Sequence, residues 1–134
     1  FQVETRPNQV RIKHTDAKKS KGACWARHEM QKLWGGEEYV LQIDSHMRFE
    51  PGWDETLIDM FGQCGTPRAV ISSYPPGFTP PDQLERDWVY GIGAKEFNKE
   101  GIFTMKGFGY RANALPPKPP LGAFVGACFL FGPS

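Results

Sequence analysis

The chain has 134 residues, a length that suits one domain. Its 16 basic and 15 acidic residues leave a formal net charge of +1, so we expect neither nucleic acid nor an anionic membrane as a partner. No apolar run approaches the roughly 18 to 20 residues that a membrane span needs, and we expect no membrane span in this segment.

The first elements predicted along the chain are a short strand and a helix. Residues 10–14 alternate apolar and charged side chains, which predicts the strand. A helix follows from Gly22 and ends before Gly35-Gly36, since glycines are typical beyond a helix C-terminus. On a helical wheel with 100° per residue, several apolar residues lie within about 80° of Ala23, on one face of this helix. This arrangement predicts a buried stripe. The apolar residues on that face are Ala26, Met30, Leu33 and Trp34.

The next segment, residues 39–43, is apolar and short, which predicts a buried strand that ends at Asp44-Ser45-His46. Pro51-Gly52 introduces a second helix, whose first turn carries acidic side chains that suit a helix N-terminus. Residues 69–72 form another strand candidate. Strands and helices therefore alternate over residues 10–72, and this pattern predicts an α/β fold with a mostly parallel central sheet flanked by helices.

The remaining residues differ from the first part in composition and in the elements that they predict. Residues 74–81 and 115–120 are rich in proline, which predicts extended loops. Strands are predicted at residues 88–94, 102–108 and 123–131, in mixed or antiparallel pairing. We expect this part, about residues 73–134, to add strands and loops over the first.

Asp44-Ser45-His46 is the sharpest chemical signal. Ligands of parallel α/β sheets bind beyond the carboxyl ends of strands, and a carboxylate with an imidazole suits a divalent ion such as Mn²⁺. A metal held by Asp44 and His46 would neutralise a diphosphate and help it to leave. The structural alternative is that Asp44 caps a turn and His46 is a solvated surface residue. Two ligands do not complete a site, so a third must come from elsewhere.

Other candidate residues carry weaker signals. Arg27 lies at the margin of the predicted buried stripe and needs an anionic partner, either a diphosphate or a carboxylate such as Asp44. Gly126-Ala127 has almost no side-chain bulk, which either admits a ligand close to the backbone or marks tight packing. Four aromatic side chains could stack on a base or sugar, although core packing is the more common role. They are Trp25, Tyr39, Trp53 and Trp88.

The cysteines bear on compartment and on a rival chemistry. Cys24, Cys64 and Cys128 are odd in number and widely spaced, which is a poor disulfide framework. They favour a reducing compartment, and we expect a cytoplasmic protein. A nucleophilic role for Cys24 with His28 is weakened because Cys24 lies off the predicted buried stripe and no orienting residue follows from the sequence.

Between Gly22 and Ile58 the chain resembles the Skp1-type polypeptide hydroxyproline GlcNAc-transferases, glycosyltransferase family 60, and is more distantly similar to the polypeptide GalNAc-transferases. The matching stretch covers a little over a quarter of the chain. The residues that carry it are Gly22-Ala23-Cys24-Trp25-Ala26-Arg27, Leu33-Trp34-Gly35-Gly36-Glu37-Glu38-Tyr39, Leu41-Gln42-Ile43-Asp44-Ser45-His46-Met47-Arg48-Phe49 and Gly52-Trp53-Asp54.

This resemblance implies a GT-A-like fold, UDP-GlcNAc as donor, and retaining transfer of GlcNAc to a protein hydroxyl, with a Skp1-like acceptor protein as partner. It implies Mn²⁺ or Mg²⁺ on Asp44 and His46. It also places Arg27 and Ser45 with Asp44 in the nucleotide-diphosphate pocket, and Gly126-Ala127 near the transferred sugar. The resemblance leaves the catalytic group unknown.

The resemblance also bears on domain organisation. The family's uridine-binding strand and loop are expected before Phe1, and a third metal ligand, a histidine, beyond Ser134. We therefore expect residues 1–134 to form a single partial domain, truncated at both ends and inactive alone, with the nucleotide- and metal-binding part at about residues 1–72. The rival hypotheses are a non-catalytic protein-binding relative of the same fold and a transferase that uses another UDP-sugar.

Overall fold

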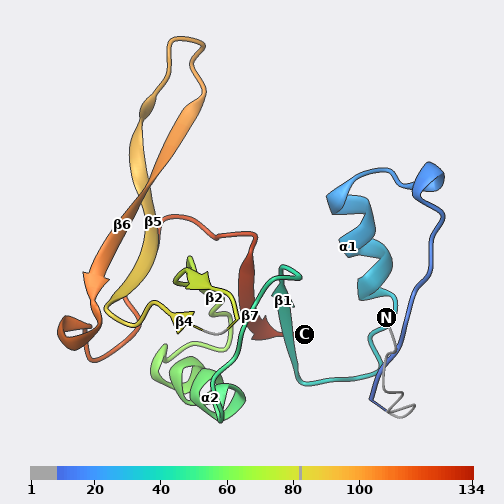
Figure 1. Cartoon of the computed structure of the whole chain (residues 1–134), viewed down its shortest axis with the longest axis horizontal. Coiled ribbons are helices and arrows are strands. Elements are labelled where there is room, and N and C mark those ends of the chain that lie inside the picture. The colour runs from blue at the N-terminus through green and yellow to red at the C-terminus, as the bar shows by residue number, and fades with distance from the viewer. Residues whose placement is uncertain (1–8, 82) are drawn as a thin grey trace. The chain divides into compact units, whose positions relative to one another are not determined.

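The computed structural model describes residues 9–81 and 83–134 (Figure 1). The chain divides into two compact units, Phe1–Glu37 and Glu38–Ser134, each of which is described by itself. The start of the predicted single domain, at residues 1–8, lies outside the described residues. In the described part of the chain, no helix combines the length and the apolar character that a membrane crossing requires.

The first unit contains a 3-10 turn, η1 (Ala17–Lys19), and helix α1 (Ala23–Gln31). The helix begins after Gly22, as predicted, because the left-handed φ of 94° at this residue suits glycine. The strand predicted at residues 10–14 is wrong: these residues form neither helix nor strand. This segment is instead linked to Glu37 by an ion pair from Arg11, at 2.9 Å. An extended segment gains little from strand geometry when no neighbouring strand pairs with it.

The buried stripe predicted on the first helix is also wrong. No residue of α1 is buried, and Met30 and Trp34 are 52% and 58% exposed. Trp25, Arg27 and Glu29 are half-buried. Periodicity predicts an apolar face, but burial also requires a second layer against that face.

The second unit is built on a sheet of three strands, β1 (Tyr39–Ile43), β7 (Phe129–Pro133) and β2 (Ile71–Ser72), in the order β1-β7-β2. Both outer strands are antiparallel to β7. They therefore run in the same direction within one sheet but do not pair with each other, because β7 lies between them. The strand pairs of the described residues are antiparallel, and the mostly parallel central sheet of the predicted fold stays a prediction. The prediction that residues 39–43 form a strand is confirmed, whereas their predicted interior position is wrong, since β1 is an edge strand of the described sheet.

Helix α2 (Trp53–Gln63) supplies the core of this unit. It begins after Gly52, as predicted, and carries acidic residues in its first turn. Among the described residues, the buried hydrophobic side chains are Leu57, Ile71 and Phe131, one each from α2, β2 and β7. Tyr39 stacks on Phe131 with ring centroids 5.3 Å apart. This cluster packs α2 against the sheet, with Tyr39 and Leu41 as the contributions of β1.

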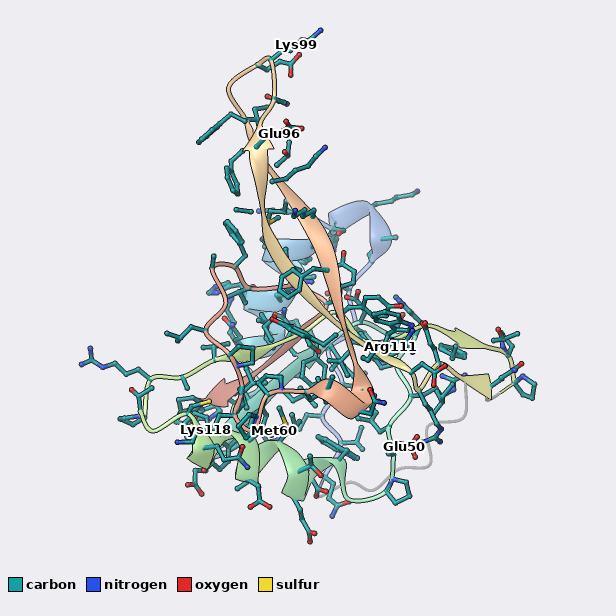
Figure 2. The ribbon with its side chains drawn as sticks, turned by 90° about the vertical axis from the view of Figure 1, so that its left-hand side faces the viewer. Glu50, Met60, Glu96, Lys99, Arg111 and Lys118 are labelled. Carbon is teal, nitrogen blue, oxygen red and sulfur yellow. The ribbon has the colours of Figure 1, made fainter. Side chains whose placement is uncertain are left out.

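The rest of the second unit is dominated by an antiparallel hairpin of β5 (Trp88–Phe97) and β6 (Phe103–Arg111). It confirms the strands predicted at residues 88–94 and 102–108. Figure 2 shows Glu96 and Lys99 towards its turn and Arg111 at its opposite end. The shorter elements are β3 (Phe78–Thr79), β4 (Gln83–Leu84) and η2 (Ala112–Ala114). Residues 115–120 form a loop as predicted, but the strand predicted at residues 123–131 begins only at Phe129.

Candidate functional site at the end of β1

Asp44-Ser45-His46 follows β1 directly and forms a turn there. The backbone N–H of Asp44 donates to the carbonyl of Cys128 at 3.2 Å, which extends the pairing of β1 with β7 by one step. Asp44 is half-buried, whereas Ser45 and His46 are exposed. The sheet therefore anchors the first residue of this motif and leaves the other two towards solvent.

A cavity of about 770 Å³ opens beside this turn. Asp44 and His46 both line it, so the structure brings the two predicted metal ligands to one space; Ser45 is not among the lining residues. The lining residues come from the segment after β1, the proline-rich loop, β4 and the residues after it, the start of β5 and the segment before β7. They are Asp44, His46, Met47, Arg48, Glu50, Tyr74, Pro75, Pro76, Gly77, Phe78, Leu84, Glu85, Arg86, Trp88, Val89 and Cys128.

Gly126-Ala127 lies between the ends of β1 and β2. The N–H of Gly126 donates to Ser72 Oγ at 2.8 Å, and Gln42 Nε2 donates to the Ala127 carbonyl at 3.0 Å. A Cβ on Gly126 would lie 3.1 Å from Ile92 Cδ1. Gly126 therefore packs closely within the protein, and Cys128, but neither Gly126 nor Ala127, is among the cavity-lining residues. The role expected for Gly126-Ala127 near the transferred sugar stays a prediction.

Arg27 and Cys24 lie on α1 in the first unit, whereas the cavity belongs to the second. Arg27 is half-buried and Cys24 is exposed. The diphosphate-binding role expected of Arg27 stays a prediction.

Two arginines at the cavity were missed by the sequence reasoning. Arg48 Cζ lies 4.7 Å from the centroid of the Phe78 ring, and Arg86 Nη2 forms an ion pair with Glu50 Oε1 at 2.7 Å. Arg48 lies two residues after His46 in the sequence, and this position beside the candidate motif was the signal that could have identified it. Arg86 belongs to a charged stretch that is typical of a solvated face, so no local pattern indicated it.

One of the four aromatic candidates lines the cavity. Trp88 does so, and Arg111 Cζ lies 5.1 Å from its ring centroid. Tyr39 packs against the core, Trp53 packs on Phe49 with centroids 4.7 Å apart, and Trp25 lies in the first unit.

A hydrogen bond to the cavity residue Glu85 shifts the pKa of a tyrosine. Tyr90 Oη donates to Glu85 Oε1 at 2.9 Å. Because the acceptor is a carboxylate, this bond stabilises the neutral phenol and raises the pKa of Tyr90, with smaller contributions from burial and from the negative charge of Glu85. The backbone N–H of Glu85 also donates to the Gly77 carbonyl at 3.0 Å. The two hydrogen bonds together hold Glu85 at the cavity.

Asp44 and His46 could supply only part of the ligand set of a metal ion. Within residues 9–81 and 83–134, no three His, Cys, Asp or Glu side chains gather closely enough to hold a metal by themselves. Asp44 and His46 offer an oxygen and a nitrogen, and small divalent ions are commonly completed by water and substrate phosphates. A metal ion at these two side chains would therefore need further ligands, such as water or substrate phosphates.

A comparison with protein families gives one match across this region. A family model described as "Glycosyltransferase (GlcNAc)" matches residues 2–134. No curated protein and no solved structure matches the chain. The family match includes both units and every residue of the cavity wall.

Proposed function

Since the chain belongs to the GlcNAc glycosyltransferase family, we propose that its cavity binds UDP-GlcNAc with a divalent cation, Mn²⁺ or Mg²⁺. The chemistry we propose is retaining transfer of GlcNAc to a protein hydroxyl of the hydroxyproline type. The proposed subfamily is the Skp1-type family 60, with a GT-A-like fold and a Skp1-like acceptor. The three cysteines are free, which supports our proposal of a reducing, cytoplasmic setting.

The observation that carries this proposal is the shared cavity of Asp44 and His46. Both side chains line one space at the carboxyl end of β1, and the bond from Asp44 N to the Cys128 carbonyl fixes where the motif begins. An oxygen and an imidazole nitrogen on the wall of one cavity would supply a partial ligand set that donor phosphates complete. When bound, the cation would neutralise the diphosphate and favour departure of UDP.

The chain's own residues would bind and orient the donor. Arg48 places positive charge on the cavity wall that Asp44 and His46 also line, where a diphosphate gains from it. Trp88 and Tyr74 offer ring faces that suit a base or the apolar face of a sugar. In the transfer, the bond from the sugar C1 to the β-phosphate oxygen breaks and the acceptor oxygen bonds to C1. The acceptor proton is lost, and UDP leaves with the bonding electrons.

The proposal predicts that Asp44→Ala in the full-length protein abolishes transfer and hydrolysis of UDP-GlcNAc in the presence of Mn²⁺. Loss of an outer-shell partner of a metal ligand alone costs about 10–100-fold in metal affinity or activity, so removal of the ligand should exceed about 100-fold. Rates are measured by UDP release, with and without an acceptor protein.

Asp59→Ala is the matched control, because Asp59 is an exposed carboxylate on α2 away from the cavity wall. Normal transfer and hydrolysis by Asp44→Ala would show that the metal assignment is wrong. A panel of UDP-GlcNAc, UDP-GalNAc and UDP-glucose tests the proposed sugar. Failure of the wild-type protein to bind UDP with Mn²⁺ would favour a protein-binding relative.

A further inference from the structure

Among the described residues, two side-chain contacts join the segment between His46 and α2 to the segment before β5. Arg48 Cζ lies 4.7 Å from the Phe78 ring centroid, and Glu50 Oε1 lies 2.7 Å from Arg86 Nη2. Arg48 and Glu50 come from the segment after β1, whereas Phe78 and Arg86 come from the segment before β5. All four residues line the same cavity as Asp44 and His46.

Backbone contacts fix the two ends of this segment. At its start, Asp44 N donates to the Cys128 carbonyl at 3.2 Å, and at its end Trp53 N donates to the Glu50 carbonyl at 3.3 Å. The residues between these ends form a turn and irregular backbone, without helix or strand. The position of His46 in the middle therefore depends on side-chain contacts.

We propose that the Glu50–Arg86 ion pair and the Arg48–Phe78 contact form a two-point clasp that holds the His46-bearing segment in place beside Asp44. Arg86 and Phe78 are then positioning residues for the metal and diphosphate site. This inference rests on the proposed function for its consequence in binding, but the clasp itself is a property of the ligand-free protein.

Because the Glu50–Arg86 ion pair is exposed, its effect on the His46 segment can be distinguished from an effect on global stability. The side chains of Arg86 and Glu50 are 69% and 52% exposed, and ion pairs this exposed contribute little to global stability. Their loss should leave the midpoint of thermal unfolding nearly unchanged. The segment around His46 should become more mobile, because fixed backbone contacts remain only at its ends.

The test is a charge exchange in the full-length protein: Glu50→Arg, Arg86→Glu, and the double variant. Each single variant should weaken Mn²⁺-dependent UDP binding about three- to fivefold, the range expected for loss of an exposed pair. The KM for UDP-GlcNAc should rise to match, with a smaller change in kcat. The double variant restores the pair with reversed charges and should bind within about twofold of wild type.

The charge-exchange variants also distinguish the clasp from a direct effect of cavity charge on ligand affinity. If only the charge of the cavity mattered, Glu50→Arg and Arg86→Glu would change the affinity for an anionic ligand in opposite directions. The clasp requires both single variants to weaken binding. For the second contact, Phe78→Leu should weaken binding and Phe78→Tyr should preserve it, since tyrosine retains the ring face.

The matched control is the exposed ion pair of Lys95 and Glu96, 3.0 Å long, in the β5–β6 hairpin. Glu96 lies near the hairpin turn and far from Glu50 (Figure 2). Reversal of both charges there should leave UDP binding unchanged.

A readout without ligand separates this inference from the proposed function. Amide hydrogen exchange of residues 45–50 should be faster in both single variants and return to the wild-type rate in the double variant. If wild type binds neither Mn²⁺ nor UDP, the proposed function fails, and the exchange rates still decide whether the clasp exists. Unchanged exchange in the single variants, or a large fall in their thermal midpoint, would overturn it.

Discussion

At the scale of single residues, the carboxylate of Glu85 shows how one cavity residue alters another. Its hydrogen bond from Tyr90, 2.9 Å long, raises the pKa of the phenol. A raised pKa in the folded state means that the bond stabilises the fold fully below the pKa of the unfolded tyrosine, about 10. That contribution is lost as the pH rises through the raised pKa of Tyr90.

Glu85→Ala should therefore lower the pKa of Tyr90 towards the ordinary tyrosine value, because it removes both the hydrogen-bond acceptor and the negative charge. The titration is followed by tyrosine NMR resonances between neutral and strongly alkaline pH. Glu96→Gln, at a carboxylate in the hairpin, should leave it unchanged. An identical Tyr90 titration in wild type and Glu85→Ala would contradict the assignment.

At the scale of elements, β7 organises the site. It lies between β1 and β2 and leads directly from Cys128, whose carbonyl receives the N–H of Asp44. The close approach of β7 to the residues just before β2 requires glycine at position 132, where a Cβ would lie 3.1 Å from the Ala69 carbonyl oxygen. A displacement of β7 would therefore also move the carbonyl that anchors Asp44.

Gly132→Val should destabilise the protein by about 1–3 kcal/mol, because backbone rather than a movable side chain opposes the added atoms. Gly62→Ala is the matched comparison: Gly62 lies in α2 and its Cβ would meet nothing within 4 Å. It should stabilise the protein by about 0.5–1 kcal/mol, since alanine favours helix. Chemical denaturation followed by tryptophan fluorescence measures both. Equal stability of Gly132→Val and wild type would refute this account of β7.

At the scale of the whole molecule, burial is unequal between the two units. The buried hydrophobic side chains of the described residues, Leu57, Ile71 and Phe131, all lie in the second unit. Helix α1 has nine residues and none of them is buried. Helices shorter than about 12–15 residues are marginal without packing, so α1 should open more readily than the core around Phe131.

Native-state hydrogen exchange should show this difference. Amides of α1 should be at least about 100-fold less protected than those of β7, because local opening exposes no buried apolar surface there. Helix α2, which is similar in length but carries buried Leu57, serves as the internal control and should be protected. Protection of α1 equal to that of α2 would mean that packing stabilises the first unit as well.

Local patterns in the sequence predicted much of what surrounds the site. The apolar run at residues 39–43 is a strand, Gly52 precedes a helix, and residues 88–94 and 102–108 pair in a hairpin. Each of these depends on neighbours in the chain, through side-chain period and the backbone freedom of glycine. The same local logic placed Asp44 and His46 together at a strand end, and the shared cavity agrees with it.

Only the tertiary structure decided which distant segments meet. No pattern within residues 10–72 indicates that Leu41 and Ile71 both lie opposite Phe131, so a parallel sheet was predicted where β7 intervenes. Arg86 likewise joins His46 at the cavity only because the chain folds back after the proline-rich loop. Such pairings depend on contacts between residues far apart in the chain, whereas side-chain periodicity records only which face each residue occupies.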